Sequence, residues 1–271
     1  MTRAVLILLG HSLKRVRTLV GVMALVFATF QVFTSLMAAT FQENQTFASL
    51  FALVPDFVRD LLGDTLLGML SFAGVVCLSY FHFAVIGALV GLSIALATEP
   101  TTEIDIGFAD LILSRPLARS VLITRTILVV VICATFVLSA MALGTWIGVT
   151  GLAPEGAVGP TPRLVLSLTA NLGALMLCWG GIALAFSAAA RRRSTAASAA
   201  GLLALGMFLF DVVSRAWKPL KAFAQLSPFH YYNPLNIVLG REVPLAHLGT
   251  LLGLGLAGAC LAYLLYGRRD I

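Results

Sequence analysis

The sequence predicts an all-α polytopic membrane protein with six transmembrane helices, and three observations lead to this fold class. Of the 271 residues, 59% are hydrophobic and only 11% are charged, which is about half the charged fraction of a typical soluble domain. The mean hydropathy is +0.98. Runs of about 20 apolar residues, long enough to cross a bilayer as helices, recur along the chain. Segments of alternating polarity, which would predict a membrane β-barrel, do not occur.

The apolar runs place the six spans in order along a single transmembrane domain, residues 1–271. We expect them at residues 19–40, 66–97, 122–149, 164–189, 195–213 and 245–266. The Gly- and Pro-rich stretch "GLAPEGAVGPTP" predicts the turn between the third and fourth spans, and "RRRS" predicts a short basic turn between the fourth and fifth. The aromatic stretch "SPFHYYNP" before the last span is typical of an interfacial aromatic belt.

The first 17 residues predict an amphipathic elbow helix that precedes the first span. Leu6, Leu9, Leu13 and Val16 fall on one helical stripe, and the basic residues fall on other faces. A helix with this pattern lies in the headgroup plane of a membrane. The alternative is that residues 1–17 simply extend the first span inward.

The basic residues predict the orientation in the membrane. The formal net charge is +6, but the basic residues cluster at the ends of apolar runs, which indicates membrane topology and not a nucleic-acid partner. With the N-terminus inside, six basic residues lie outside and twelve inside. The twelve inner residues are Arg3, Lys14, Arg15, Arg17, Arg115, Arg119, Arg125, Arg191, Arg192, Arg193, Arg268 and Arg269. This bias predicts a multi-pass protein of the cell membrane with both termini in the cytoplasm.

A short charged helix interrupts the apolar sequence at residues 104–119. Ile104, Phe108, Leu111 and Ile112 recur at helical spacing and form one apolar stripe, while Asp110 and a preceding aspartate suit a helix beginning. Pro116 restricts Arg115 and ends the helix. We expect Arg119 and Arg125 to restart the chain near the lipid surface. From these residues alone, a coupling element and an ordinary interfacial loop helix remain equal alternatives.

The stretch "EIDIGFADLILSRPLAR" resembles the first cytoplasmic loop of ABC-2 type ABC transporter permeases. That family has E-x-x-x-G-T, a run of leucines and then P-x-x-R, and Phe108 replaces the usual threonine. The matching positions are Glu103, Gly107, Leu111, Leu113, Pro116 and Arg119. The segments "RRRSTAASAAG", "SPFHYYNP" and "YGRRDI" follow in the order typical of the family. The chain is most similar to the small permeases of the bacitracin-resistance and nitrous-oxide-reductase-maturation types.

The resemblance implies a transport subunit without catalysis of its own, with export as the expected direction. Its cytoplasmic coupling helix would dock on a separate ABC ATP-binding subunit, which would hold the ATP and Mg²⁺, and a second permease copy or a paralogue would complete the transporter. The residues implied in binding the ATPase are Glu103, Ile104, Gly107, Phe108, Asp110, Leu111, Ile112, Arg115, Pro116 and Arg119.

The sequence predicts a chain that is not an enzyme and binds no cofactor itself. None of its three lysines follows a glycine, so the phosphate-binding motif G-x-x-x-x-G-K-[ST] is excluded. The hydrolase motifs G-x-S-x-G and H-E-x-x-H are also missing. The alternative function is a secondary transporter or channel without an ATPase partner, which would usually carry broken helices and several intramembrane charges.

Three polar residues in the spans are candidates for a substrate path: His82, Asp211 and Arg215. Asp211 and Arg215 are four residues apart, which places them on one helical face, and the favoured alternative is a pair that only stabilises the helix end. An ionisable group inside a span indicates function by default. His82 could instead form a structural hydrogen bond with a neighbouring helix.

The remaining motifs predict packing and no metal site. The four cysteines lie far apart in apolar runs, which indicates neither disulfides nor zinc. The pairs Gly87–Gly91, Gly144–Gly148 and Gly249–Gly253 have the G-x-x-x-G spacing that permits close helix approach.

Overall fold

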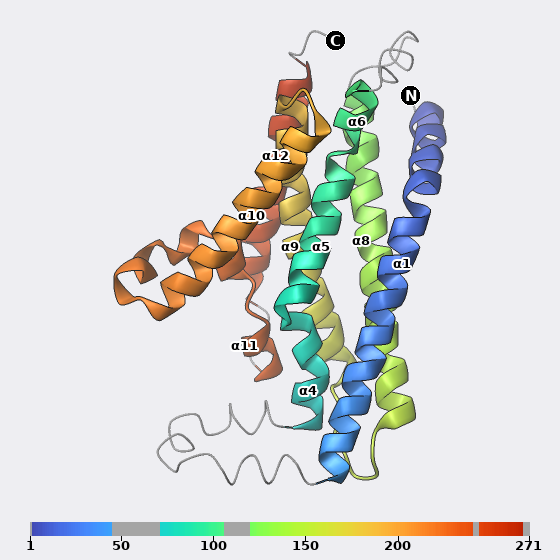
Figure 1. Cartoon of the computed structure of the whole chain (residues 1–271), viewed down its shortest axis with the longest axis vertical. Coiled ribbons are helices and arrows are strands. Elements are labelled where there is room, and N and C mark those ends of the chain that lie inside the picture. Colours follow the sequence, from blue (N-terminus) through green and yellow to red (C-terminus); the bar gives the residue numbers. More distant parts are fainter. Residues whose placement is uncertain (1, 45–70, 106–119, 241–243, 268–271) are drawn as a thin grey trace.

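The computed structural model of the chain describes residues 2–44, 71–105, 120–240 and 244–267 (Figure 1). Within these ranges the regular structure is entirely helical. The elements are α1 (Thr2–Glu43), α4 (Phe72–Leu78), η1 (Ser79–Phe81), α5 (Phe83–Ala97), α6 (Glu99–Asp105), α8 (Ser120–Leu152), α9 (Pro162–Ala189), α10 (Arg193–Ala216), η2 (Lys218–Leu226), η3 (Pro228–Tyr231), α11 (Pro234–Val238) and α12 (Leu245–Gly267).

The structure confirms an all-α polytopic membrane protein. In the described part of the chain, six helical stretches are long and apolar enough to cross a membrane. Their positions follow the predicted apolar runs, with the fourth, for example, at Pro162–Ala189. The start of α1 and the end of α12 lie at the same end of the bundle (Figure 1), as six successive spans require.

The N-terminal segment differs from the predicted elbow. Residues 1–17 were expected to form a separate in-plane helix, whereas α1 runs without a break from Thr2 to Glu43. No proline interrupts this stretch, and a salt bridge between Arg15 and Glu99 holds it against the bundle. At 1.5 Å per residue, α1 is about 63 Å long, roughly twice the hydrocarbon thickness of a bilayer. The helix therefore extends well beyond one bilayer core.

The second span is broken at Ser79–His82, which the sequence did not predict. In a continuous helix the Ala84 N–H would donate to the Tyr80 carbonyl, but here it donates to Nδ1 of His82, 3.3 Å away. The Tyr232 hydroxyl donates to the Tyr80 carbonyl in its place. The side chain of Ser79 bonds Gln31 of α1 at 2.7 Å. A break inside a membrane protein persists because other groups satisfy the freed backbone in this way.

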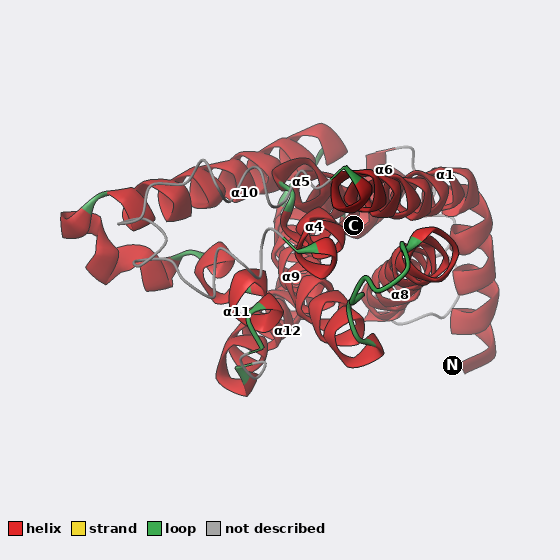
Figure 2. Ribbon diagram, turned by 90° about the horizontal axis from the view of Figure 1, so that it is seen from below, coloured by secondary structure: helices red, strands yellow, loops and turns green. Residues whose placement is uncertain are grey.

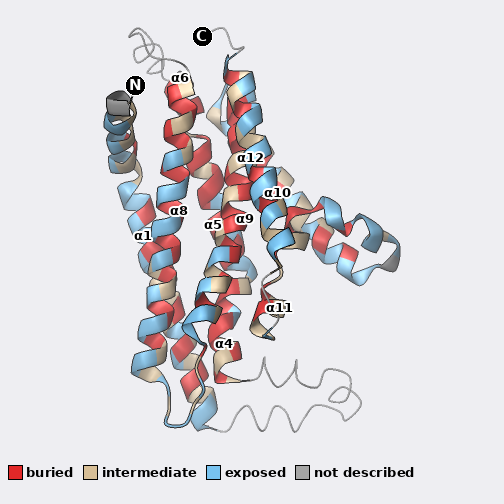
Figure 3. Ribbon diagram, turned by 180° about the vertical axis from the view of Figure 1, so that it is seen from behind, coloured by how far each residue is buried: buried red, intermediate tan, exposed pale blue. Residues whose placement is uncertain are grey.

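The packed core is centred on α9. In its most apolar stretch 67% of residues are buried, against 22% in α10 and 17% in α12, and Trp179 is fully buried. Figure 3 shows the same contrast between the buried interior and the exposed face of α10. Glycines allow two close helix pairs: a Cβ on Gly144 would lie 2.5 Å from the Ala28 carbonyl oxygen of α1, and one on Gly181 would lie 2.0 Å from that of Gly255 in α12.

α10 leaves the bundle at an angle. It begins beside α6 and projects sideways, so that its end and η2 form an arm away from α5 and α9 (Figures 1 and 2). The chain returns through η3 and α11. There the predicted interfacial belt is only partly correct, because Phe229 and Tyr232 of "SPFHYYNP" are buried against the bundle. The ring of Phe229 packs against Trp179 of α9 and Phe208 of α10.

Candidate functional sites

The first charged site is a buried pair between α6 and α8. Arg125 Nη1 and Nη2 donate to the two carboxylate oxygens of Glu103 at 2.9 and 2.8 Å. The side chains are only 2% and 4% exposed. A two-pronged bond of this kind fixes both the distance and the relative orientation of its groups. The pair therefore joins α6 rigidly to the beginning of α8, the end of that helix that the sequence predicts to lie near the cytoplasm.

A second carboxylate extends this site to two more helices. Glu99, in the first turn of α6 where an acid suits the helix dipole, has Oε1 2.6 Å from Arg15 Nη1 of α1. This contact is an ion pair whose geometry is not that of a hydrogen bond. The other carboxylate oxygen of Glu99, Oε2, lies 3.5 Å from Arg193 Nη2 of α10. Arg193 also donates to the Ala95 carbonyl.

A hydroxyl pair adds the central helix. The buried Thr101 and Ser187 oxygens lie 2.6 Å apart, and the Thr101 hydroxyl also donates to the Ser187 carbonyl at 3.0 Å. The seven-residue α6 is thus bonded to α1, α8, α9 and α10. We call Glu99, Thr101, Glu103 and Arg125 the α6 cluster. α6 ends directly before residues 106–119, and Arg125 follows them in α8.

The α6 cluster revises part of the sequence prediction. Arg125 was expected near the lipid surface but is buried, because Glu103 neutralises it inside the bundle. Glu103, predicted to contact an ATPase, has its carboxylate turned toward Arg125. Ile104 belongs to the end of α6. The other predicted partner-binding residues lie outside the described residues: Gly107, Phe108, Asp110, Leu111, Ile112, Arg115, Pro116 and Arg119.

The second charged site is the predicted pair on α10, and its geometry confirms the i, i+4 spacing. Arg215 Nε donates to Asp211 Oδ2 at 2.8 Å. The two partners differ in access, since the Asp211 side chain is 7% exposed and that of Arg215 is 54% exposed. Asp211 Oδ1 is buried without a hydrogen bond to any described residue. His230 Nδ1 lies 4.0 Å from this oxygen.

A cavity of about 270 Å³ lies beside this pair. Asp211, Arg215 and Asn233 give it polar groups, and aromatic rings form much of the remaining wall. Burial raises the pKa of the Tyr232 phenol, with a smaller contribution from Tyr80, so Tyr232 stays protonated and keeps its bond to the Tyr80 carbonyl. His82 does not line this cavity. Its ring stacks on Phe83 and meets Phe30 of α1 edge-on, where it caps α5.

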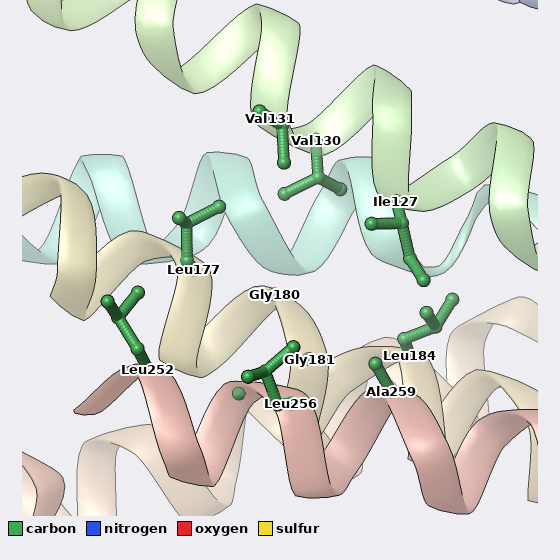
Figure 4. Close-up of a pocket in the computed structure, with 11 residues that line it drawn as sticks. Ile127, Val130, Val131, Leu177, Gly180, Gly181, Leu184, Leu252, Leu256 and Ala259 are labelled. Atoms are coloured by element: carbon green, nitrogen blue, oxygen red, sulfur yellow. The ribbon is translucent and has the colours of Figure 1, made fainter. Parts of the chain in front are cut away.

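A further apolar cavity of about 130 Å³ lies between α8, α9 and α12 (Figure 4). Its walls include Val130, Leu184 and Leu256, with Gly180 and Gly181 on the α9 side. Every residue that lines it is aliphatic or glycine. Such a wall offers contact to hydrocarbon and provides no polar group that would orient a ligand.

The fold and these two sites define a multi-pass α-helical membrane protein. Within the described ranges, no group of three or more His, Cys, Asp or Glu residues is arranged to hold a metal ion. Neither a family model, nor a curated protein, nor a solved structure matches the chain.

Proposed function

We propose that the chain is the transmembrane permease subunit of an ABC transporter of the ABC-2 type. It moves a substrate, in the export direction, while a separate cytoplasmic subunit binds and hydrolyses ATP with Mg²⁺. The chain itself carries out no catalysis. Two permease copies, or this chain and a paralogue, form the pathway in the cell membrane, with both termini in the cytoplasm.

The α6 cluster is the observation that supports this proposal most. A cytoplasmic partner that pushes on residues 106–119 needs a rigid connection to the spans. α6 immediately precedes that segment and is bonded to α1, α8, α9 and α10. The motif residues Glu103 to Arg119 resemble the family's coupling loop at the same place in the chain. The bonds of α6 and the motif residues together support a segment through which a force from the partner could be transmitted to several helices at once.

A secondary transporter is the second candidate, and the broken second span favours it. Discontinuous helices with ionisable groups near the break are typical of such transporters. Here the break holds His82, whose side chain is occupied in capping α5, and Tyr80, whose hydroxyl shares a hydrogen bond with Thr145. The buried Glu103–Arg125 pair lies in the α6 cluster, at one end of the bundle, whereas the buried charge near the break is the carboxylate of Asp211, which shares a cavity wall with Phe81. For these reasons we favour the ABC permease.

A pull-down experiment tests the proposal. The purified permease serves as bait, and the measured quantity is the amount of a candidate ABC ATP-binding subunit, encoded in the same genome, that it recovers. Leu111 belongs to the apolar stripe of residues 104–119, and its full burial against a partner would contribute about 1.5 to 3 kcal/mol. We expect Leu111→Asp to abolish recovery of the ATPase by the purified permease in matched detergent. Ion pairs at the rim, such as those of Asp110 and Arg115, would set the register and contribute less affinity.

Two control variants make the result specific. Leu111→Met conserves side-chain volume and polarity and should retain the partner. Val158→Asp adds the same charge at an exposed position in the loop between α8 and α9 and should also retain it. Equal recovery by wild type and Leu111→Asp would contradict the proposed role of this segment.

A further inference from the structure

The divergence of α10 from α5 leaves a groove that continues from the cavity beside Asp211. A second cavity of about 300 Å³ shares Ile86, Phe208 and Phe229 with the first. It extends along α5 as far as Ile94, and Gly201 lies on its α10 side. From Ile86 to Ile94 the α5 wall rises by about 12 Å. The two cavities form one elongated groove, which we call the α5–α10 groove.

Glycines keep the inner part of this groove open. A Cβ added at Gly87, Gly91 or Gly201 would meet no atom within 4 Å, in contrast to the tightly packed Gly144 and Gly181. The remaining wall of this part is aliphatic or aromatic. An apolar slot of this shape suits a hydrocarbon chain, because the hydrophobic effect is non-directional and favours burial of the chain at any point along the wall.

The outer part of the groove carries an accessible positive charge. Arg215 lines the cavity and is half exposed, while the partner carboxylate of Asp211 lies beneath it and is buried. Asp211 engages only Nε, so both Nη groups of Arg215 have no bonding partner among the described residues. Asn233 lines the same part and adds an amide. A guanidinium fork held in place by a carboxylate matches the geometry of carboxylate and phosphate groups.

From this arrangement we infer that the α5–α10 groove binds a single-chain anionic amphiphile that enters from the bilayer. Its carboxylate or phosphate headgroup meets Arg215 and Asn233, and its chain lies along Gly87 and Gly91. Asp211 is a positioning residue that orients Arg215. That this amphiphile is also the transported substrate rests on the proposed function, whereas the binding itself does not.

Photo-crosslinking of the full-length permease in phosphatidylcholine nanodiscs, without any ATPase, tests this inference. The probe is dodecyl phosphate with a diazirine in its chain, and the labelled peptides should come from α5 and α10. Unlabelled dodecyl phosphate should compete at least about tenfold better than dodecyltrimethylammonium, since a charge-assisted bond is formed with one headgroup only.

Two pairs of variants separate the head from the chain. Arg215→Gln should remove the preference for phosphate while labelling persists, and Arg163→Gln, at an exposed arginine of α9, should leave the preference unchanged. Gly91→Leu should fill the slot and remove labelling for either headgroup. Gly253→Leu, at an equally open glycine of α12, should leave labelling unchanged.

Several results would overturn the inference. These are labelling spread evenly over all spans, equal or better competition by the cationic amphiphile, and unchanged labelling of the Gly91→Leu variant. The outcome is independent of ATPase recovery. If the wild-type permease recovers the ATPase but is not labelled in α5 and α10, the groove is refuted and the permease proposal stands. If it is labelled there but does not recover the ATPase, the permease proposal is refuted and the groove stands.

Discussion

The two arginine–carboxylate pairs of this protein use the same chemistry in opposite ways. In the Glu103–Arg125 pair both carboxylate oxygens are bonded and both side chains are buried. In the Asp211–Arg215 pair one oxygen is bonded, and the arginine is half exposed beside a cavity. A closed pair, with both side chains buried, is out of reach of a ligand and serves to hold helices together. An open pair keeps donors that a ligand can use.

Their positions reinforce this contrast. Arg193, at the start of α10, belongs to the surroundings of the α6 cluster, and Asp211 lies 18 residues further along the same helix, about 27 Å at helical rise. α10 thus connects the proposed entry point for mechanical load with the proposed ligand site, and a tilt of this weakly packed helix would alter the groove.

The largest expected effect is a difference in labelling that shows which of the two arginine–carboxylate pairs lies toward the cytoplasmic side of the membrane. Gly156, in the loop before α9, and Ser194, in the first turn of α10 after it, are both exposed. Single cysteines at these positions, in a background without the four native cysteines, should react with an impermeant maleimide from opposite sides of the membrane, Ser194→Cys from the cytoplasm. Labelling of both from the same side would contradict the six-span topology and remove the basis of the comparison.

The closed pair should dominate stability. Glu103→Leu leaves Arg125 buried without a counter-charge, which typically costs about 3 to 5 kcal/mol. The double variant Glu103→Leu/Arg125→Met removes both charges and should regain most of this loss. The free energy of unfolding in mixed micelles, measured over the full double-mutant cycle, checks the coupling. Additive single losses would show that the two side chains do not depend on each other.

The open pair should contribute far less when its carboxylate is neutralised. Asp211→Asn leaves Arg215 with access to water, so we expect a loss of at most about 1 kcal/mol in the same unfolding measurement, as for other partly exposed pairs. The preference for dodecyl phosphate should weaken in this variant because Arg215 is no longer held. A stability loss as large as that of Glu103→Leu would mean that the two pairs do not differ as described.

Much of the fold could be predicted from local sequence signals. Long apolar runs place the spans because hydrocarbon thickness fixes their length. The spacing of Asp211 and Arg215 predicts their contact because both lie on one helix. In contrast, Glu103 and Arg125 are 22 residues apart on different helices, and no periodicity indicates such a pair. The i, i+4 spacing of Glu99 and Glu103 was the one available signal that two acids share a face.

Helix contacts and the broken span were harder to predict for the same reason. Gly144 and Gly148 do pack on α1, but Gly249 and Gly253 face open space, and α12 instead approaches α9 at Gly255. Small residues permit close approach without specifying the partner. The break at Ser79–His82 contains neither Pro nor Gly. It depends on Tyr232, 152 residues away from Tyr80, which sequence spacing does not reveal.

The proposed coupling through residues 104–119 is tested most directly by the rate of ATP hydrolysis of the candidate ATP-binding subunit. The rate is measured for that subunit alone, with the wild-type permease and with the Leu111→Asp permease, each reconstituted in the same lipid at equal molar ratio. We predict that the wild-type permease raises the rate and that Leu111→Asp permease leaves it at the level of the isolated subunit. Equal stimulation by both permeases would contradict the account.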